Sequence, residues 1–108
     1  MTNIRTITSS EFESKVMQAQ QAVILDFYQA TCAPCRVLEP RLEAAAQQYA
    51  GRISVYRVDI EHDLSIAGRL GVKSIPTVLV FRNGNETERL DGLITDQQLP
   101  AAFEHTAT

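Results

Sequence analysis

Cys32 and Cys35 are the only two cysteines of the chain, and two residues separate them. Three assignments fit this spacing: a redox couple, half of a metal site, or two small residues of a hydrophobic core. A disulfide between them would close a ring of four residues, and so short a ring constrains the unfolded chain very little. A bond between these two sulfurs would therefore serve chemistry rather than stability.

A metal site is the weaker alternative. A structural zinc ion takes four ligands, and besides the two thiols the chain offers His62 and His105, which are far apart in the sequence. A zinc or iron–sulfur centre would need the cysteine pairs of two chains. The residues favour a redox couple, and we expect no bound metal.

The cysteines lie between a predicted central strand and a predicted helix. Residues 22–28 form a nearly continuous apolar run, as in a strand that is covered on both faces. Residues 36–49 carry apolar side chains at helical spacing, and Pro34 fits the first helical position. Cys32 then precedes the first turn, where free N–H groups and the helix dipole favour a thiolate, while Cys35 is more buried. The pattern predicts Cys32 as the nucleophile and Cys35 as the resolving thiol.

One acidic residue, Asp26, interrupts the apolar strand. Burial of an unpaired carboxylate is costly, so burial should raise the pKa of Asp26. Beneath the start of the next helix, it could take the proton from Cys35. The alternative places it near a strand end with its side chain in water. Arg57, on a neighbouring strand predicted over 53–59, could pair with Asp26 or be solvated, and the local sequence leaves both open.

The rest of the chain alternates strand and helix patterns. Pro100 should make the last helix start late or bend, because a proline past the first turn loses a hydrogen bond. The order of the elements predicts an α/β fold with a mixed sheet between helices. The other expected elements are a strand over 4–7, a helix from a Thr8–Glu11 capping box to about residue 19, a helix over 63–70, a hairpin of 77–81 and 86–90 around Asn83-Gly84, and a helix from residue 95.

Length and charge limit the classes of function. We expect one domain over 1–108, because 108 residues can bury one core. The net charge is −3 and the basic residues are scattered, which argues against a nucleic-acid surface. No apolar run is long enough for a signal peptide or a membrane span. We therefore expect a cytoplasmic protein, whose thiols are kept reduced.

Over essentially its whole length, the chain resembles the thioredoxin family. The resemblance implies the thioredoxin fold, a central mixed β-sheet flanked by helices on both faces, and a dithiol–disulfide oxidoreductase that reduces protein disulfides. It rests on short motifs in the family's order and spacing: Leu25-Asp26-Phe27, Cys32-Ala33-Pro34-Cys35, Pro40, Val58-Asp59, Gly71-Val72, Ile75-Pro76-Thr77, Phe81 with Asn83-Gly84, and Gly92.

The resemblance also implies roles for individual residues. Asp26 matches the family's buried acid, and Arg57 stands where a basic residue, usually lysine, lies near that acid. Pro76 matches a cis-proline that faces the cysteine pair, where the backbone of Ile75 would bind a substrate strand by hydrogen bonds. Gly92 matches a glycine that keeps the binding surface open.

The partners are implied in the same way. They are proteins that contain disulfides and a flavin-dependent thioredoxin reductase that draws electrons from NADPH. Beyond the redox-active Cys32–Cys35 disulfide, the protein should carry no cofactor. We expect a monomer that binds neither nucleic acid nor a membrane.

The active-site motif departs from the family's usual Trp-Cys-Gly-Pro-Cys. Thr31 removes a large apolar ring beside the nucleophile, Ala33 stiffens the loop, and the chain contains no tryptophan. Pro34 is retained, and the histidine of oxidising relatives is absent, so we expect a reductant. Thr31, Ala33 and Pro34 should contact substrates. The alternative function is a thioredoxin-fold binding module or holdase subunit, in which the redox cycle is secondary.

Overall fold

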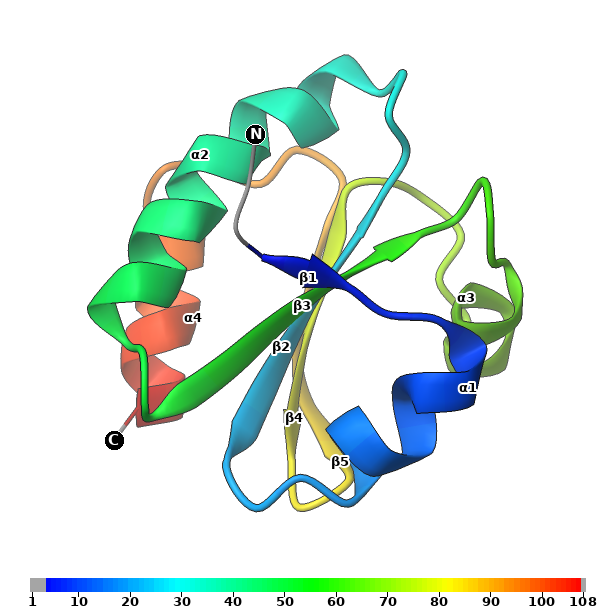
Figure 1. Cartoon of the computed structure of the whole chain (residues 1–108). Helices are drawn as coiled ribbons and strands as arrows, with labels where there is room; N and C mark the ends of the chain where they lie inside the picture. Colours follow the sequence, from blue (N-terminus) through cyan, green and yellow to red (C-terminus); the bar gives the residue numbers. More distant parts are fainter. Residues whose placement is uncertain (1–3, 108) are drawn as a thin grey trace.

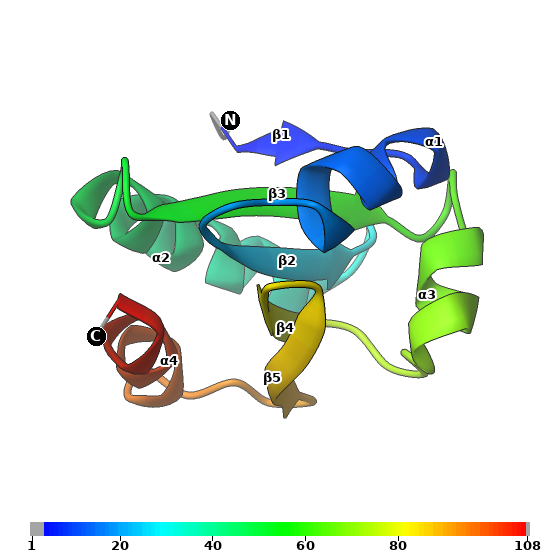
Figure 2. The ribbon, with the colours of Figure 1, turned by 90° about the horizontal axis from the view of Figure 1, so that it is seen from below.

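The computed structural model describes residues 4–107. Its strands form one mixed sheet in the order β1-β3-β2-β4-β5, and helices cover both faces (Figures 1 and 2), as the sequence predicted. The strands are β1 (Arg5–Thr6), β2 (Ala22–Tyr28), β3 (Ile53–Asp59), β4 (Thr77–Arg82) and β5 (Asn85–Asp91). The helices are α1 (Ser9–Phe12), which continues as the π-helical turn η1 (Glu13–Met17), α2 (Ala33–Gln48), α3 (Ser65–Leu70) and α4 (Gln98–Ala107).

The central strand β2 is buried on both faces. It runs parallel to β3 and antiparallel to β4. Val23, Leu25 and Phe27 pack into the core beneath α1 and α3, while Ile24 packs beneath α2 and α4. Because side chains alternate along a strand, Asp26 shares the face of Ile24 and therefore lies under α2 and α4. Figure 2 shows these two helices together on one side of the sheet.

Helix α2 begins earlier than the apolar periodicity predicted. It starts at Ala33, three residues before the apolar pattern and one residue before the first helical position predicted for Pro34, with Cys32 as its N-cap. Pro34 is consequently the second helical residue rather than the first, and its missing N–H still needs no partner there. Cys32 thus precedes the first turn and Cys35 lies within the helix, as the placement of Pro34 predicted.

Helix α4 starts at Gln98, later than the predicted start at residue 95. Pro100 is its third residue, so it lies in the first turn, where a proline breaks no helical hydrogen bond. Ahead of it, the Thr95 N–H donates to Gln98 Oε1 at 2.8 Å and the Gln98 N–H donates to Thr95 Oγ1 at 3.2 Å. The predicted late start is confirmed.

The first helix combines a regular start with a widened end. The predicted capping box is present: the Thr8 N–H donates to Glu11 Oε1 at 3.2 Å. Further along, the helix widens, and the Gln18 N–H donates to the Glu13 carbonyl at 2.9 Å, an i to i−5 bond. Sequence periodicity did not distinguish this π-helical turn from an α-helix.

The turn between β4 and β5 supplies a stability prediction. Gly84 has φ +78°, and a Cβ built there would lie 3.0 Å from the Met17 carbonyl oxygen. We expect Gly84→Ala to lower the free energy of unfolding by about 2 kcal/mol or more, from the left-handed backbone and the close contact together. Urea unfolding of the oxidised protein measures the loss.

Gly51→Ala is the matched control, because Gly51 has φ +88° with open space around the added Cβ. Its free energy of unfolding should fall by only about 1 kcal/mol, the cost of placing alanine in the left-handed backbone conformation. Equal losses in the two variants would show that the approach of Met17 contributes nothing.

Candidate active site

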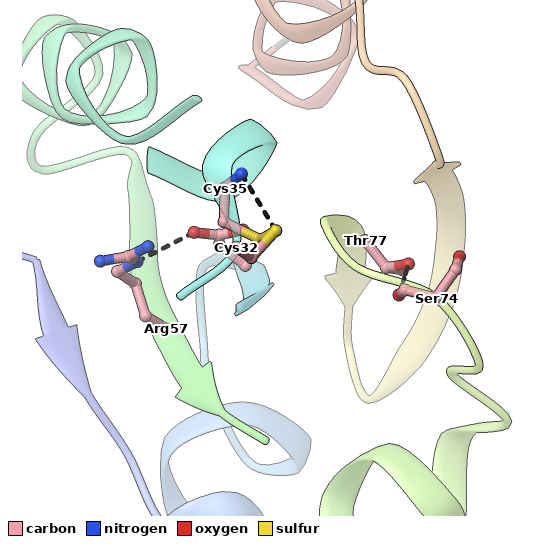
Figure 3. Close-up of a disulfide and its surroundings, with 6 residues drawn as sticks. Cys32, Cys35, Arg57, Ser74 and Thr77 are labelled. Carbon is pink, nitrogen blue, oxygen red and sulfur yellow. Dashed lines mark hydrogen bonds and ion pairs between the residues drawn. A yellow bond between two sulfur atoms is a disulfide. The ribbon is translucent and has the colours of Figure 1, made fainter. Parts of the chain in front are cut away.

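The two cysteines form a disulfide at the N-terminus of α2, with their Cα atoms 5.3 Å apart. Cys32 has extended backbone angles, and its Sγ accepts a hydrogen bond from the Cys35 N–H at 3.3 Å (Figure 3). Cys32 is half-buried, whereas Cys35 has no exposed surface. A thiolate formed at Cys32 on reduction would meet the same free N–H groups and the positive end of the helix dipole.

Asp26 is fully buried on the face of the sheet that α2 covers. Its Oδ2 accepts a hydrogen bond from Arg57 Nε at 2.9 Å, while its buried Oδ1 has no partner within residues 4–107. Burial raises the pKa of Asp26 to about 6, against the attraction of the Arg57 charge. The alternative with Asp26 in water is therefore wrong, and this carboxyl can exchange a proton near neutral pH.

Of the two alternatives for Arg57, paired with Asp26 or solvated, the structure has the first: its side chain is buried, with only 4% of its surface exposed. Besides Asp26, its guanidinium binds Glu39, with Nη1 donating to Oε2 at 2.5 Å. It also stacks over the Tyr28 ring, 3.6 Å from the ring centroid. Figure 3 shows the Arg57 side chain on β3, with the dashed hydrogen bond from its guanidinium running toward the side of the cysteine pair. One buried cation thus joins β2, β3 and α2 at the active site.

Glu39 is the member of this cluster that the sequence analysis missed. It follows Cys35 by four residues on α2, a spacing that places two side chains on one helix face. That spacing is the signal that could have found it. Cys35, Glu39 and Arg57 line a cavity of about 360 Å³. Its other lining residues are Thr6, Tyr28, Gln29, Ala30 and Arg36.

A second, apolar cavity of about 350 Å³ opens on the other side of the α2 N-terminus; we call it the apolar groove. It brings Ala33 and Pro34 together with Pro76, whose peptide bond to Ile75 is cis. Leu93 lines it and is 84% exposed. The remaining lining residues are Val37, Leu38, Arg41 and Ile94.

Three of the predicted binding residues lie outside the lining of the apolar groove. Thr31 is exposed in the loop before α2. The Ile75 side chain packs against the core beneath α1 and α3. Gly92 precedes Leu93 with φ +71° and has no atom within 4 Å of an added Cβ. Figure 3 also shows the turn before β4, where the Thr77 hydroxyl donates to the Ser74 carbonyl at 2.6 Å.

The two histidines occupy other parts of the fold. His62 Nε2 lies 3.6 Å from Asp59 Oδ2, and His105 Nδ1 lies 3.9 Å from Glu88 Oε1. Within residues 4–107, no group of three or more His, Cys, Asp or Glu side chains is arranged to hold a metal ion. Over the same part of the chain, no helix is both long enough and apolar enough to cross a bilayer.

Comparison with known proteins identifies the family. The family profile described as thioredoxin matches residues 3–105. Thioredoxin 1 of Nostoc sp. is 32% identical over 98 residues, 91% of this chain and 92% of the relative. The M-type chloroplastic thioredoxin of Brassica napus is 30% identical over 103 residues, 95% of this chain but 58% of the relative. The chain belongs to the thioredoxin family, and it has the family's fold, its redox-active disulfide at Cys32–Cys35 and its thiol–disulfide oxidoreductase function.

Proposed function

We propose that the protein reduces disulfides of other proteins, with Cys32 as the nucleophile and Cys35 as the resolving thiol. The observation that carries this assignment is the unequal burial of two sulfurs at one helix N-terminus. Half-buried Cys32 can meet a sulfur of another protein. Fully buried Cys35 cannot reach a substrate disulfide and can react only with the neighbouring Cys32 sulfur, once that sulfur is bonded to a substrate.

The proposed cycle is an exchange of sulfur–sulfur bonds. The Cys32 thiolate attacks one sulfur of the substrate disulfide, that bond breaks, and the other substrate sulfur leaves as a thiolate. The Cys35 thiol then loses its proton, attacks the Cys32 sulfur and releases the second substrate thiolate. Two electrons pass to the substrate, and the Cys32–Cys35 disulfide is the oxidised product.

Asp26 is the proposed acceptor of the Cys35 proton. Its Oδ1 has no hydrogen-bond partner within residues 4–107, so a lone pair is available, while Arg57 binds Oδ2. A pKa of about 6 leaves most of the carboxyl ionised at pH 7 and still basic enough to take a proton. Arg57 in turn holds the carboxylate in one orientation and limits the cost of its charge.

Substrates are proposed to dock along the apolar groove. Their apolar side chains would bury surface against Pro34, Pro76 and the exposed Leu93. An extended substrate segment would hydrogen-bond to the Ile75 backbone. Ala33, which replaces the glycine usual in the family, lines this groove, and Thr31, which replaces the larger ring, is exposed beside it in the loop before α2. The residues proposed to contact substrate are Thr31, Ala33, Pro34, Ile75, Pro76 and Gly92.

A flavin-dependent thioredoxin reductase that uses NADPH is proposed to reduce the Cys32–Cys35 disulfide of the oxidised protein back to the dithiol. Membership of the thioredoxin family supports this partner, as it supports protein disulfides as substrates. We further propose that residues 1–108 act as one monomeric domain in the cytoplasm, where NADPH is available. Packing of every helix within residues 4–107 on one sheet supports the single domain.

The first test is the equilibrium reduction potential of the Cys32–Cys35 pair, measured by thiol labelling in defined redox buffers. We expect a value near roughly −270 mV, the general figure already established for thioredoxin itself. A value above about −200 mV would indicate an oxidant or a redox sensor and would contradict the reductase assignment.

A further inference from the structure

We propose that Glu39 is a positioning residue that shares the Arg57 guanidinium with Asp26 and thereby keeps Asp26 able to hold a proton near neutral pH. The inference deepens the proposed function, because it rests on Asp26 as the acceptor of the Cys35 proton. It assigns a role to the carboxylate that the sequence analysis did not single out.

The geometry divides one positive charge between two carboxylates. Arg57 donates from Nε to Asp26 at 2.9 Å and from Nη1 to Glu39 at 2.5 Å. Both bonds come from a side chain that is 4% exposed, so water screens them weakly. The donors of the guanidinium lie in one planar fork, which fixes the geometry of both contacts.

Without Glu39, the permanent charge of Arg57 would act on Asp26 alone and would hold it ionised. A carboxylate beside an arginine ordinarily has a lowered pKa, which makes it a poor proton acceptor. The Glu39 carboxylate opposes this lowering of the pKa of Asp26 in two ways. It partly neutralises the positive charge of Arg57, and it repels a negative charge on Asp26. The charge of Glu39 raises the pKa of Asp26, in the same direction as burial.

The other charged or ionisable side chains around the site come from α2 and β2. Arg36 and Cys35 on α2 and Tyr28 on β2 line the same cavity as Glu39 and Arg57 of β3. On its other side Asp26 pairs in register with Val78 of β4, which adds no charge. Glu39 is thus the only acidic side chain that shares this cavity's lining within the described residues.

The decisive experiment titrates Asp26 directly in the oxidised protein, by NMR of ¹³C-labelled aspartate side-chain carboxyls, with Asp26→Asn to assign the resonance. In Glu39→Gln, the midpoint of the Asp26 titration should fall by at least about half a pH unit, because the repelling charge is gone. Glu39→Ala, which also removes the hydrogen bond to Arg57, should shift it in the same direction. An unchanged or higher midpoint would overturn the inference.

Glu43→Gln is the matched control, since it removes the same charge one turn further along α2 and Glu43 does not line this cavity. It should leave the Asp26 midpoint within about 0.2 pH units of the wild type, because a more distant charge is largely screened. An equal shift in both variants would attribute the effect to net charge and would contradict the role of Glu39.

A kinetic measurement separates this inference from the proposed function. At pH 8, where Asp26 is ionised in both proteins, the rate of resolution of a preformed mixed disulfide should fall about 2-fold in Glu39→Gln, because a carboxylate with a lower pKa is a weaker base. If the NMR midpoint falls and this rate does not change, Asp26 is not the proton acceptor, yet the control of Asp26 by Glu39 stands.

Discussion

Cys32→Ser is expected to reduce protein disulfides no faster than the uncatalysed exchange with the same electron donor. A serine hydroxyl is not ionised at neutral pH, and its oxygen cannot take part in a mixed disulfide. Cys35→Ser should lose turnover as well, but for a different reason. Its Cys32 still attacks the substrate, and the reaction then stops at the mixed disulfide because no resolving thiol follows.

The two variants are distinguished by mass spectrometry of the protein after incubation with an oxidised model substrate. Cys35→Ser should carry one substrate molecule bound through Cys32, and dithiothreitol should release it. Cys32→Ser should carry none. Retention of full turnover by Cys32→Ser would refute the mechanism, and a covalent adduct on Cys35 would reverse the two assigned roles.

The Cys32→Ser/Cys35→Ser double variant tests the alternative of a binding module. It removes both sulfurs and leaves the apolar groove between Pro34, Pro76 and Leu93 intact. Under the reductase mechanism, this variant should no longer capture the substrate proteins that Cys35→Ser traps as mixed disulfides, because it has no sulfur to bond them. Retention of the biological activity by this variant would make binding the principal function.

The parts of the fold that the sequence predicted well are those with strong local signals. The apolar run of β2 indicated a strand covered on both faces, and Asn83-Gly84 indicated the hairpin turn. Both signals depend on neighbours in the chain. The residues themselves also indicated the two reactive sulfurs, because a Cys-x-x-Cys pair between a strand and a helix, in a chain without further cysteines, favours redox chemistry over a metal site.

The charged cluster could be predicted only in part, because it depends on register and on helix placement. Asp26 pairs with Arg57 across two parallel strands that a helix connects, and no local pattern fixes that register. Glu39 joins them only because α2 crosses above this pair. The apolar pattern of α2 begins three residues after its start, since apolar periodicity contains no information about a cysteine N-cap, whereas Pro34 predicted the start at Ala33 within one residue.

Asp26→Asn is expected to stabilise the oxidised protein at pH 8 by about 3 kcal/mol. Burial raises the pKa of Asp26 from its ordinary 3.8 to about 6. This rise of about two units corresponds to about 3 kcal/mol at 1.36 kcal/mol per unit. Between these two values the folded protein holds a proton that the unfolded chain has released, so stability falls as pH rises through the window. Above it, the ionised carboxylate imposes its full cost, which the neutral amide avoids.

The pH dependence of this gain is the test, measured as the free energy of unfolding in urea at pH 4 and pH 8. At pH 4 the folded wild type holds Asp26 largely protonated, so the advantage of Asp26→Asn should nearly vanish. Asp63→Asn is the control of opposite sign. Hydrogen bonds from Ser65 and Ser9 lower the pKa of Asp63 to about 2, so this variant should lose stability at pH 8. An equal gain for Asp26→Asn at both pH values would show that the buried charge is not its cause.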